Sequence, residues 1–101
     1  MLPKEEELQV QSWEPMRNLP DKEINDFKDI VNAVEVEFLK ASELFGPFNS
    51  AHEGWAVLKE EVDELWDEVK KKQELRSIEK MRKEAIQVAA MAIRFIYDVE
   101  K

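Results

Sequence analysis

Five side chains in the second half of the chain have the types and spacing that could bind a divalent cation. Glu60, Glu61 and Glu64 are close together in the sequence, and Glu84 and Gln87 follow later, three residues apart. Residues three apart in a helix lie on one face, so each group can present its oxygens together. Carboxylate and amide oxygens are the ligands that Mg²⁺ and Mn²⁺ prefer. If the two helices that carry these groups pack antiparallel, the groups can meet in one metal site.

The same pattern also describes an ordinary solvated helix face. Glutamate is common on helices, and an acidic stripe is usually exposed to water. The polar residues of the later group could instead form hydrogen bonds with nearby cations, namely Lys80, Lys83 or Arg94. Residue types and spacing alone leave both interpretations open.

A first helix is predicted to begin after Pro20, where Asp21 can cap it. Apolar or small residues then recur at alternating steps of three and four, which places them on one face of a helix of about 22 residues. Gly46 and Pro47 are predicted to end it, because glycine suits a C-terminal cap and proline cannot continue the ladder. The residues on this face are Ile24, Phe27, Val31, Val34, Phe38, Ala41 and Phe45.

A second helix is predicted to start at Ser50, which forms an S-x-x-E capping box with Glu53. Three lysines, residues 70–72, are predicted to end it, because cations complement the dipole at a helix C-terminus. One face of this helix is acidic and carries the first three candidate ligands. The opposite face is apolar and comprises Trp55, Leu58, Val62, Leu65, Trp66 and Val69.

A third helix is predicted from about Ile78 to the C-terminus, after a polar turn over residues 73–79. Its middle, residues 85–97, is apolar almost all round apart from Gln87 and Arg94. Three helices of about 20 residues cannot surround such a helix. We therefore expect an all-α protomer of three main helices in a hairpin-type arrangement. A four-helix-type bundle would be completed by self-association, as a homodimer or a dimer of dimers.

The N-terminal segment differs from the rest of the chain. Residues 1–20 hold three of the 4 prolines and have no sustained period. We expect an extended arm there, with Trp13 and Met16 able to lie on the body or on a partner subunit, and a helical domain over residues 21–101. A frayed terminus fits the same composition.

Composition excludes several classes of protein. The chain of 101 residues has 15 basic and 23 acidic residues, for a net charge of −8, which argues against binding nucleic acid. It has no cysteine, so zinc–thiolate sites and cysteine nucleophiles are excluded. No apolar run approaches the ~20 residues of a membrane span, and the acidic N-terminus does not resemble a signal peptide. We expect a cytoplasmic protein without a membrane partner. No glycine-rich phosphate loop is present.

The helix order and the acidic motifs together resemble the MazG-like all-α nucleoside triphosphate pyrophosphohydrolases. That family has an E-E-x-x-E segment in one helix and an E-x-x-D segment in a following helix. The resemblance covers roughly residues 24–97 and includes the alanine-rich third helix. Residues 52–55 and 83–92 are similar to small MazG-like members.

The resemblance implies a role for each candidate residue. Glu61, Glu64 and Glu84 match metal ligands of the family, and Glu60 matches the first glutamate of the motif, which could orient a ligand or a water. Gln87 stands where the family has an aspartate. Glutamine offers an oxygen without a negative charge, so we expect weaker Mg²⁺ binding.

The implied activity is hydrolysis of a nucleoside triphosphate to a monophosphate and pyrophosphate, of the housecleaning type, with Mg²⁺ or Mn²⁺ as cofactor. Lys83 and Arg94 are the candidate contacts to the substrate phosphates. The departure at Gln87 also fits a catalytically degenerate member that acts as a helical dimerisation or interaction module. An unrelated acidic helical adaptor is a third interpretation. The sequence indicates no base or sugar preference.

Overall fold

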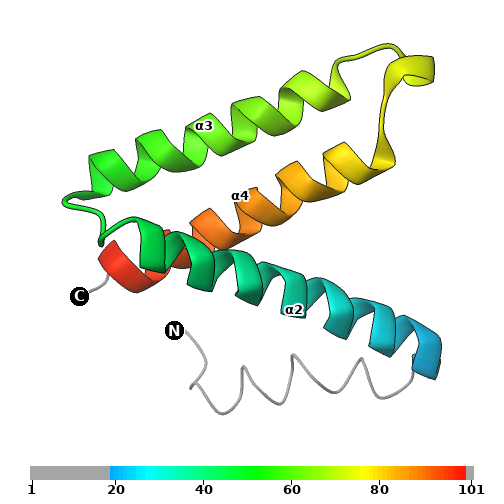
Figure 1. Ribbon diagram of the computed structural model, residues 1–101, viewed down its shortest axis with the longest axis horizontal. Coiled ribbons are helices and arrows are strands. Elements are labelled where there is room, and N and C mark those ends of the chain that lie inside the picture. Colours follow the sequence, from blue (N-terminus) through cyan, green and yellow to red (C-terminus); the bar gives the residue numbers. More distant parts are fainter. Residues whose placement is uncertain (1–18, 100–101) are drawn as a thin grey trace, which may run out of the picture. The chain divides into compact units, whose positions relative to one another are not determined.

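The computed structural model describes residues 19–99, which form three α-helices and one short 3₁₀ helix (Figure 1). The elements are α2 (Asp21–Leu44), α3 (Ala51–Val69), η2 (Gln73–Leu75) and α4 (Ile78–Val99). The described residues contain no strand. The prediction of an all-α chain with three main helices is therefore confirmed.

The chain divides into two compact units, residues 1–31 and residues 32–101. Helix α2 begins in the first unit and ends in the second. The N-terminal arm predicted for residues 1–20, with Trp13 and Met16, lies outside the described residues except for Leu19 and Pro20. All the candidate ligands belong to the second unit.

Helix α2 ends just before Gly46 and Pro47, the two residues that the sequence predicts to end it. Gly46 does not adopt a positive φ, so it does not form a left-handed C-terminal cap. Pro47 explains the end better, because its ring keeps the preceding residue out of the helical region. The backbone N–H of Phe45 donates to the carbonyl of Ala41 at 2.9 Å and closes the last turn.

Helix α3 begins at the predicted cap. Ser50 has an extended backbone, and its hydroxyl accepts the backbone N–H of Glu53 at 3.1 Å. The Glu53 carboxylate accepts the backbone N–H of Asn49 at 3.3 Å and the side-chain amide N–H of Asn49 at 3.0 Å. The returning bond of the capping box thus reaches Asn49 instead of Ser50, which ties the loop before α3 to its first turn.

Helices α3 and α4 form an antiparallel hairpin. Gly54, early in α3, lies against Phe95, late in α4, whereas Glu64 lies near Glu84 towards the other end of the hairpin. Gly54 is buried, and a methyl group placed there would lie 2.8 Å from the ring of Phe95 and 3.1 Å from that of Phe48. The absence of a side chain at Gly54 lets this end of the hairpin pack closely.

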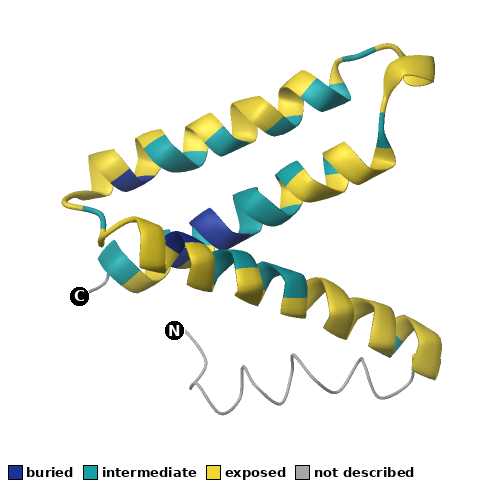
Figure 2. Cartoon of the chain, in the orientation of Figure 1, coloured by how far each residue is buried: buried dark blue, intermediate teal, exposed yellow. Residues whose placement is uncertain are grey.

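The buried core of the second unit is small and gathers towards the loop between α2 and α3 (Figure 2). Phe38 of α2 meets Tyr97 of α4 edge to face, with ring centroids 6.0 Å apart. The cluster comprises Ala41, Ala90 and Met91, with Val34, Phe38, Val57 and Leu58 packed against it.

The apolar faces of α3 and α4 are only partly covered within one chain. Trp55 and Trp66 are 57% and 58% exposed, and Ile96 and Tyr97 are 56% and 57% exposed. The sequence predicts that the middle of α4 is covered on several sides, and residues 19–99 provide only part of that cover. Among the described helices, none has the length and apolar character needed to cross a membrane.

Candidate metal centre

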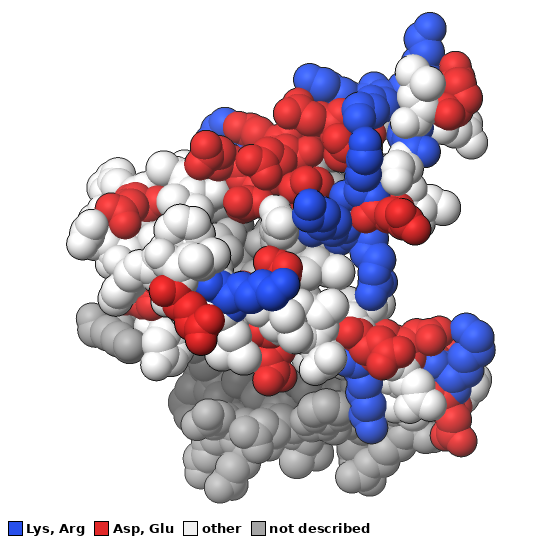
Figure 3. Space-filling model, in the orientation of Figure 1, with Lys and Arg blue, Asp and Glu red and all other residues white. Residues whose placement is uncertain are grey.

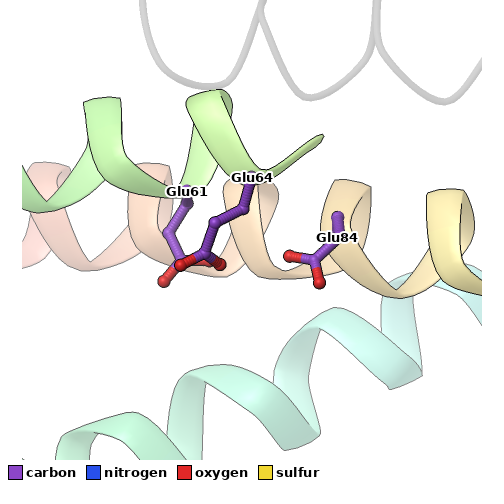
Figure 4. Close-up of side chains that lie close together, drawn as sticks. All are labelled: Glu61, Glu64 and Glu84. Carbon is purple, nitrogen blue, oxygen red and sulfur yellow. The ribbon is translucent and has the colours of Figure 1, made fainter. Parts of the chain in front are cut away.

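Three carboxylates from two helices converge in the second unit (Figure 4). Glu61 and Glu64 extend from α3 and Glu84 extends from α4, and each offers one oxygen within 4.8 Å of the others. Metal–oxygen distances of about 2.0–2.6 Å place opposite ligands of one ion roughly 4–5 Å apart. The three oxygens are therefore spaced closely enough to contact a single cation. The antiparallel hairpin brings these residues together as the sequence predicts.

Glu61 and Glu84 are partly buried, whereas Glu64 is exposed. One oxygen of Glu61 and one of Glu84 are buried without a hydrogen-bond partner. The Glu64 carboxyl lies close enough to hydrogen-bond with each of these side chains when one of the pair is protonated. Burial, followed by repulsion from Glu64 and then Glu84, raises the pKa of Glu61 to about 7. Burial and repulsion from Glu64 also raise the pKa of Glu84, against an opposing effect of Lys83. A divalent cation would satisfy both orphaned oxygens and offset the repulsion, so this donor set fits a hard metal ion.

The ion pairs of α3 separate these residues from the rest of its acidic face. Figure 3 shows acidic side chains gathered over α3. Lys59, Lys70 and Lys71 pair with Asp63, Asp67 and Glu68 at 2.9, 3.0 and 2.9 Å. Within the described part of the chain, the three converging glutamates have no such cationic partner. The three converging glutamates therefore lack the neutralising cation that Asp63, Asp67 and Glu68 have.

Gln87 and Lys83 flank the cluster on α4. Gln87 is half-buried, one turn beyond Glu84. Lys83 is exposed and lines a cavity of about 360 Å³ with Glu37, Glu79 and Arg82. The amide ligand predicted at Gln87 and the phosphate contact predicted at Lys83 stay predictions.

Arg94 is buried and bonded within the chain. It is 3% exposed, and its guanidinium donates to the carbonyl of Gly46 at 2.9 Å and lies 4.5 Å from the ring centre of Phe48. Asp98 approaches the same guanidinium at 3.9 Å and accepts the backbone N–H of Phe48 at 3.3 Å. Arg94 and Asp98 together hold the loop between α2 and α3. A phosphate contact by Arg94 stays a prediction.

A cavity of about 800 Å³ adjoins the carboxylates, and sequence reasoning did not find it. Glu61 belongs both to its wall and to the carboxylate cluster, and Glu60 lies beside it. The rest of the wall comes from the end of α2, from α3 and α4, and from the loop that Arg94 holds. The other residues are Leu44, Phe45, Gly46, Pro47, Phe48, Asn49, Glu53, Val57, Met91 and Arg94. The loop aromatics and the capping box were visible in the sequence, but nothing there placed them beside Glu61.

No protein family, curated protein or solved structure matches this chain. The MazG-like resemblance therefore rests on the order of the helices and on the acidic motifs.

Proposed function

We propose that this protein is a divalent-cation-dependent nucleoside triphosphate pyrophosphohydrolase of the MazG-like type. The observation that carries the proposal is the meeting of Glu61, Glu64 and Glu84 from two helices, with two buried oxygens that lack partners. The cavity that shares Glu61 gives a substrate a place beside these carboxylates.

In the proposed reaction, water attacks phosphorus and the bond between the α- and β-phosphates breaks, giving a nucleoside monophosphate and pyrophosphate. Glu61, Glu64 and Glu84 would hold Mg²⁺ or Mn²⁺, and the amide oxygen of Gln87 would add a neutral ligand. A bound ion would neutralise phosphate oxygens and lower the pKa of a water. Glu60, exposed on the cavity wall beside Glu61, orients the attacking water. Without a cation the carboxylates would repel the triphosphate.

Self-association is part of the proposal. Trp55, Val62 and Trp66 are exposed at helical spacing along α3, and Ile96 and Tyr97 are exposed on α4. Burying a large apolar side chain stabilises an assembly by roughly 1.5–3 kcal/mol. A second copy of the chain would cover these faces and complete a four-helix-type bundle, as a homodimer or a dimer of dimers.

The alternative function is a catalytically degenerate helical interaction module on the same fold. Two observations favour it. Gln87 removes one charge from the family motif, and the exposed apolar residues of α3 and α4 suit a binding surface. On this view the carboxylate cluster is a remnant.

Pyrophosphate release separates the two functions. The purified protein is incubated with a panel of ribo- and deoxyribonucleoside triphosphates, with Mg²⁺ and separately with Mn²⁺. The enzyme reading expects metal-dependent release that falls at least a hundredfold in Glu64→Gln. Asp63→Asn is the matched control, because Asp63 is adjacent on α3 and pairs with Lys59 outside the cluster. A wild-type protein that releases no pyrophosphate from any nucleotide would favour the interaction module.

A further inference from the structure

The cavity beside the carboxylates has several apolar residues in its wall. Phe45 and Leu44 are exposed there, and Pro47, Val57 and Met91 also contribute to the wall. Apolar and aromatic walls with a few polar groups are typical of pockets that bind a planar organic ring. The ring of Phe48 is already covered by Arg94, which leaves Phe45 as the exposed aromatic ring on this wall.

Two donor side chains on the wall, Arg94 and Asn49, make hydrogen bonds within the chain. The guanidinium of Arg94 donates to the carbonyl of Gly46 and to the sulfur of Met91. The backbone N–H and the side-chain amide of Asn49 both donate to Glu53. The carboxylates of Glu53 and Glu60 offer a ligand only acceptors, and the amide of Asn49 offers its oxygen together with a second N–H.

These acceptors are arranged along the cavity. Glu53 and Glu61 are eight residues apart on α3, so they lie about 12 Å apart along its axis. Glu61 marks the end at the carboxylate cluster, and the Asn49–Glu53 pair marks the opposite end. A nucleotide with its phosphates at the cluster would therefore direct its base towards Asn49 and Glu53.

We propose that this cavity binds the base of a nucleotide and selects bases that carry an exocyclic amino group. The inference rests on the proposed function, because that function places the phosphates at the carboxylates. An amino group donates hydrogen bonds to the acceptors that line this end. A carbonyl in the same position brings its lone pairs against them and leaves both sides unpaired, which costs affinity.

Nucleoside monophosphates test the selection independently of hydrolysis, because they have no pyrophosphate to lose. CMP and UMP differ by an amino group in place of a carbonyl, and GMP and IMP differ by the presence of one amino group. Calorimetric titration of the full chain with each, in the presence of Mg²⁺, should show CMP and GMP binding about tenfold or more tighter than UMP and IMP.

Asn49→Ala removes one acceptor and should reduce the preference within each pair to about twofold. Asn32→Ala is the matched control, since Asn32 is exposed on α2 and is not on the cavity wall. Melting curves check that both variants fold. Equal affinity within both pairs for the wild-type chain would overturn the inference, as would the absence of binding by all four.

The binding test of base selection and the pyrophosphate-release test of the proposed function can fail independently. Equal binding within the pairs together with metal-dependent pyrophosphate release would overturn the base selection and leave the hydrolase standing. Selective binding of CMP and GMP without pyrophosphate release from any triphosphate would support the base selection and count against the hydrolase.

Discussion

Glu61 of α3 and Glu84 of α4 each bury one carboxylate oxygen without a hydrogen-bond partner, and both belong to a group whose oxygens lie within 4.8 Å of one another. Two like charges held this way destabilise the fold unless a proton or a cation compensates them. The stability of the chain should therefore report the state of this cluster.

Stability without divalent cations should decrease with rising pH. The pKa of Glu61 is raised from 4.5 to about 7, so between these values the folded chain holds a proton that the unfolded chain has released. The contribution of this proton to the free energy of unfolding is therefore fully present below about pH 4.5 and is lost as pH rises through 7. Since each pKa unit corresponds to about 1.4 kcal/mol, Glu61→Gln should stabilise the metal-free protein by ~1–3 kcal/mol at pH 8.

Urea denaturation at pH 5, 6, 7 and 8 in the presence of a chelator measures this dependence. Asp63→Asn, which removes an exposed acid paired with Lys59, should change stability by less than about 0.5 kcal/mol. A wild-type protein whose stability rises between pH 5 and 8 would contradict the assignment of Glu61 as the destabilised acid.

Gln87→Asp distinguishes the enzyme from the interaction module. In the enzyme, the new carboxylate lies one turn beyond Glu84 and should tighten Mg²⁺ binding about tenfold, equivalent to ~1.4 kcal/mol, and raise pyrophosphate release. In the module, a half-buried charge would only lower the melting temperature. Calorimetry and melting curves on the same variant separate the two, and a lower melting point with unchanged metal affinity would favour the module.

Gly54→Ala should destabilise the hairpin between α3 and α4. The added methyl group would lie 2.8 Å from the ring of Phe95, and overpacking of this kind costs roughly 1–3 kcal/mol. The gain in helix propensity is about 1 kcal/mol, so the net loss should lie between about 0 and 2 kcal/mol.

The control for this substitution is Gly46→Ala. A methyl group at Gly46 would meet nothing within 4 Å, and Gly46 has no positive φ. The free energy of unfolding of the Gly46→Ala variant should therefore differ little from that of the wild type. Chemical denaturation compares the two variants. An increased stability of Gly54→Ala would show that the hairpin is looser than the structure has it.

Trp66→Glu should weaken self-association. Trp66 is 58% exposed on α3, and a tryptophan at the centre of an interface typically contributes 2 kcal/mol or more. Light scattering at micromolar concentration should report at least a dimer for the wild type and a shift towards the 11.9 kDa monomer for the variant. Asp67→Ala, at an adjacent exposed position, should leave the mass unchanged. A wild-type monomer would end the proposal of a bundle completed by a second copy.

The sequence predicts the helices well because their signals are local. Ser50 caps α3, Pro47 follows the end of α2, and the helical spacing of Glu61 and Glu64 fixes their common face. Their meeting with Glu84 also follows from the sequence, once an antiparallel hairpin is assumed. Local patterns carry these features because each depends on residues a few positions apart or on one short connection.

The environment of Arg94 could not be predicted in the same way. Its main partner, the carbonyl of Gly46, is 48 residues away in the sequence, and any backbone carbonyl can accept such a bond. The cavity beside Glu61 depends on this contact, because Arg94 holds the loop that forms much of its wall. The sequence also could not predict the exposure of Trp55, because helical periodicity marks an apolar face but does not show what covers it.

Titration of the protein with Mn²⁺ tests the central claim most directly, since electron paramagnetic resonance reports the free ion. The wild-type chain should bind one Mn²⁺ for each set of Glu61, Glu64 and Glu84, and Mg²⁺ should compete for it. Affinity should fall at least tenfold in Glu64→Gln and stay within twofold in Asp63→Asn. A wild-type protein that binds no Mn²⁺, or a Glu64→Gln variant that binds it equally well, would contradict the metal centre.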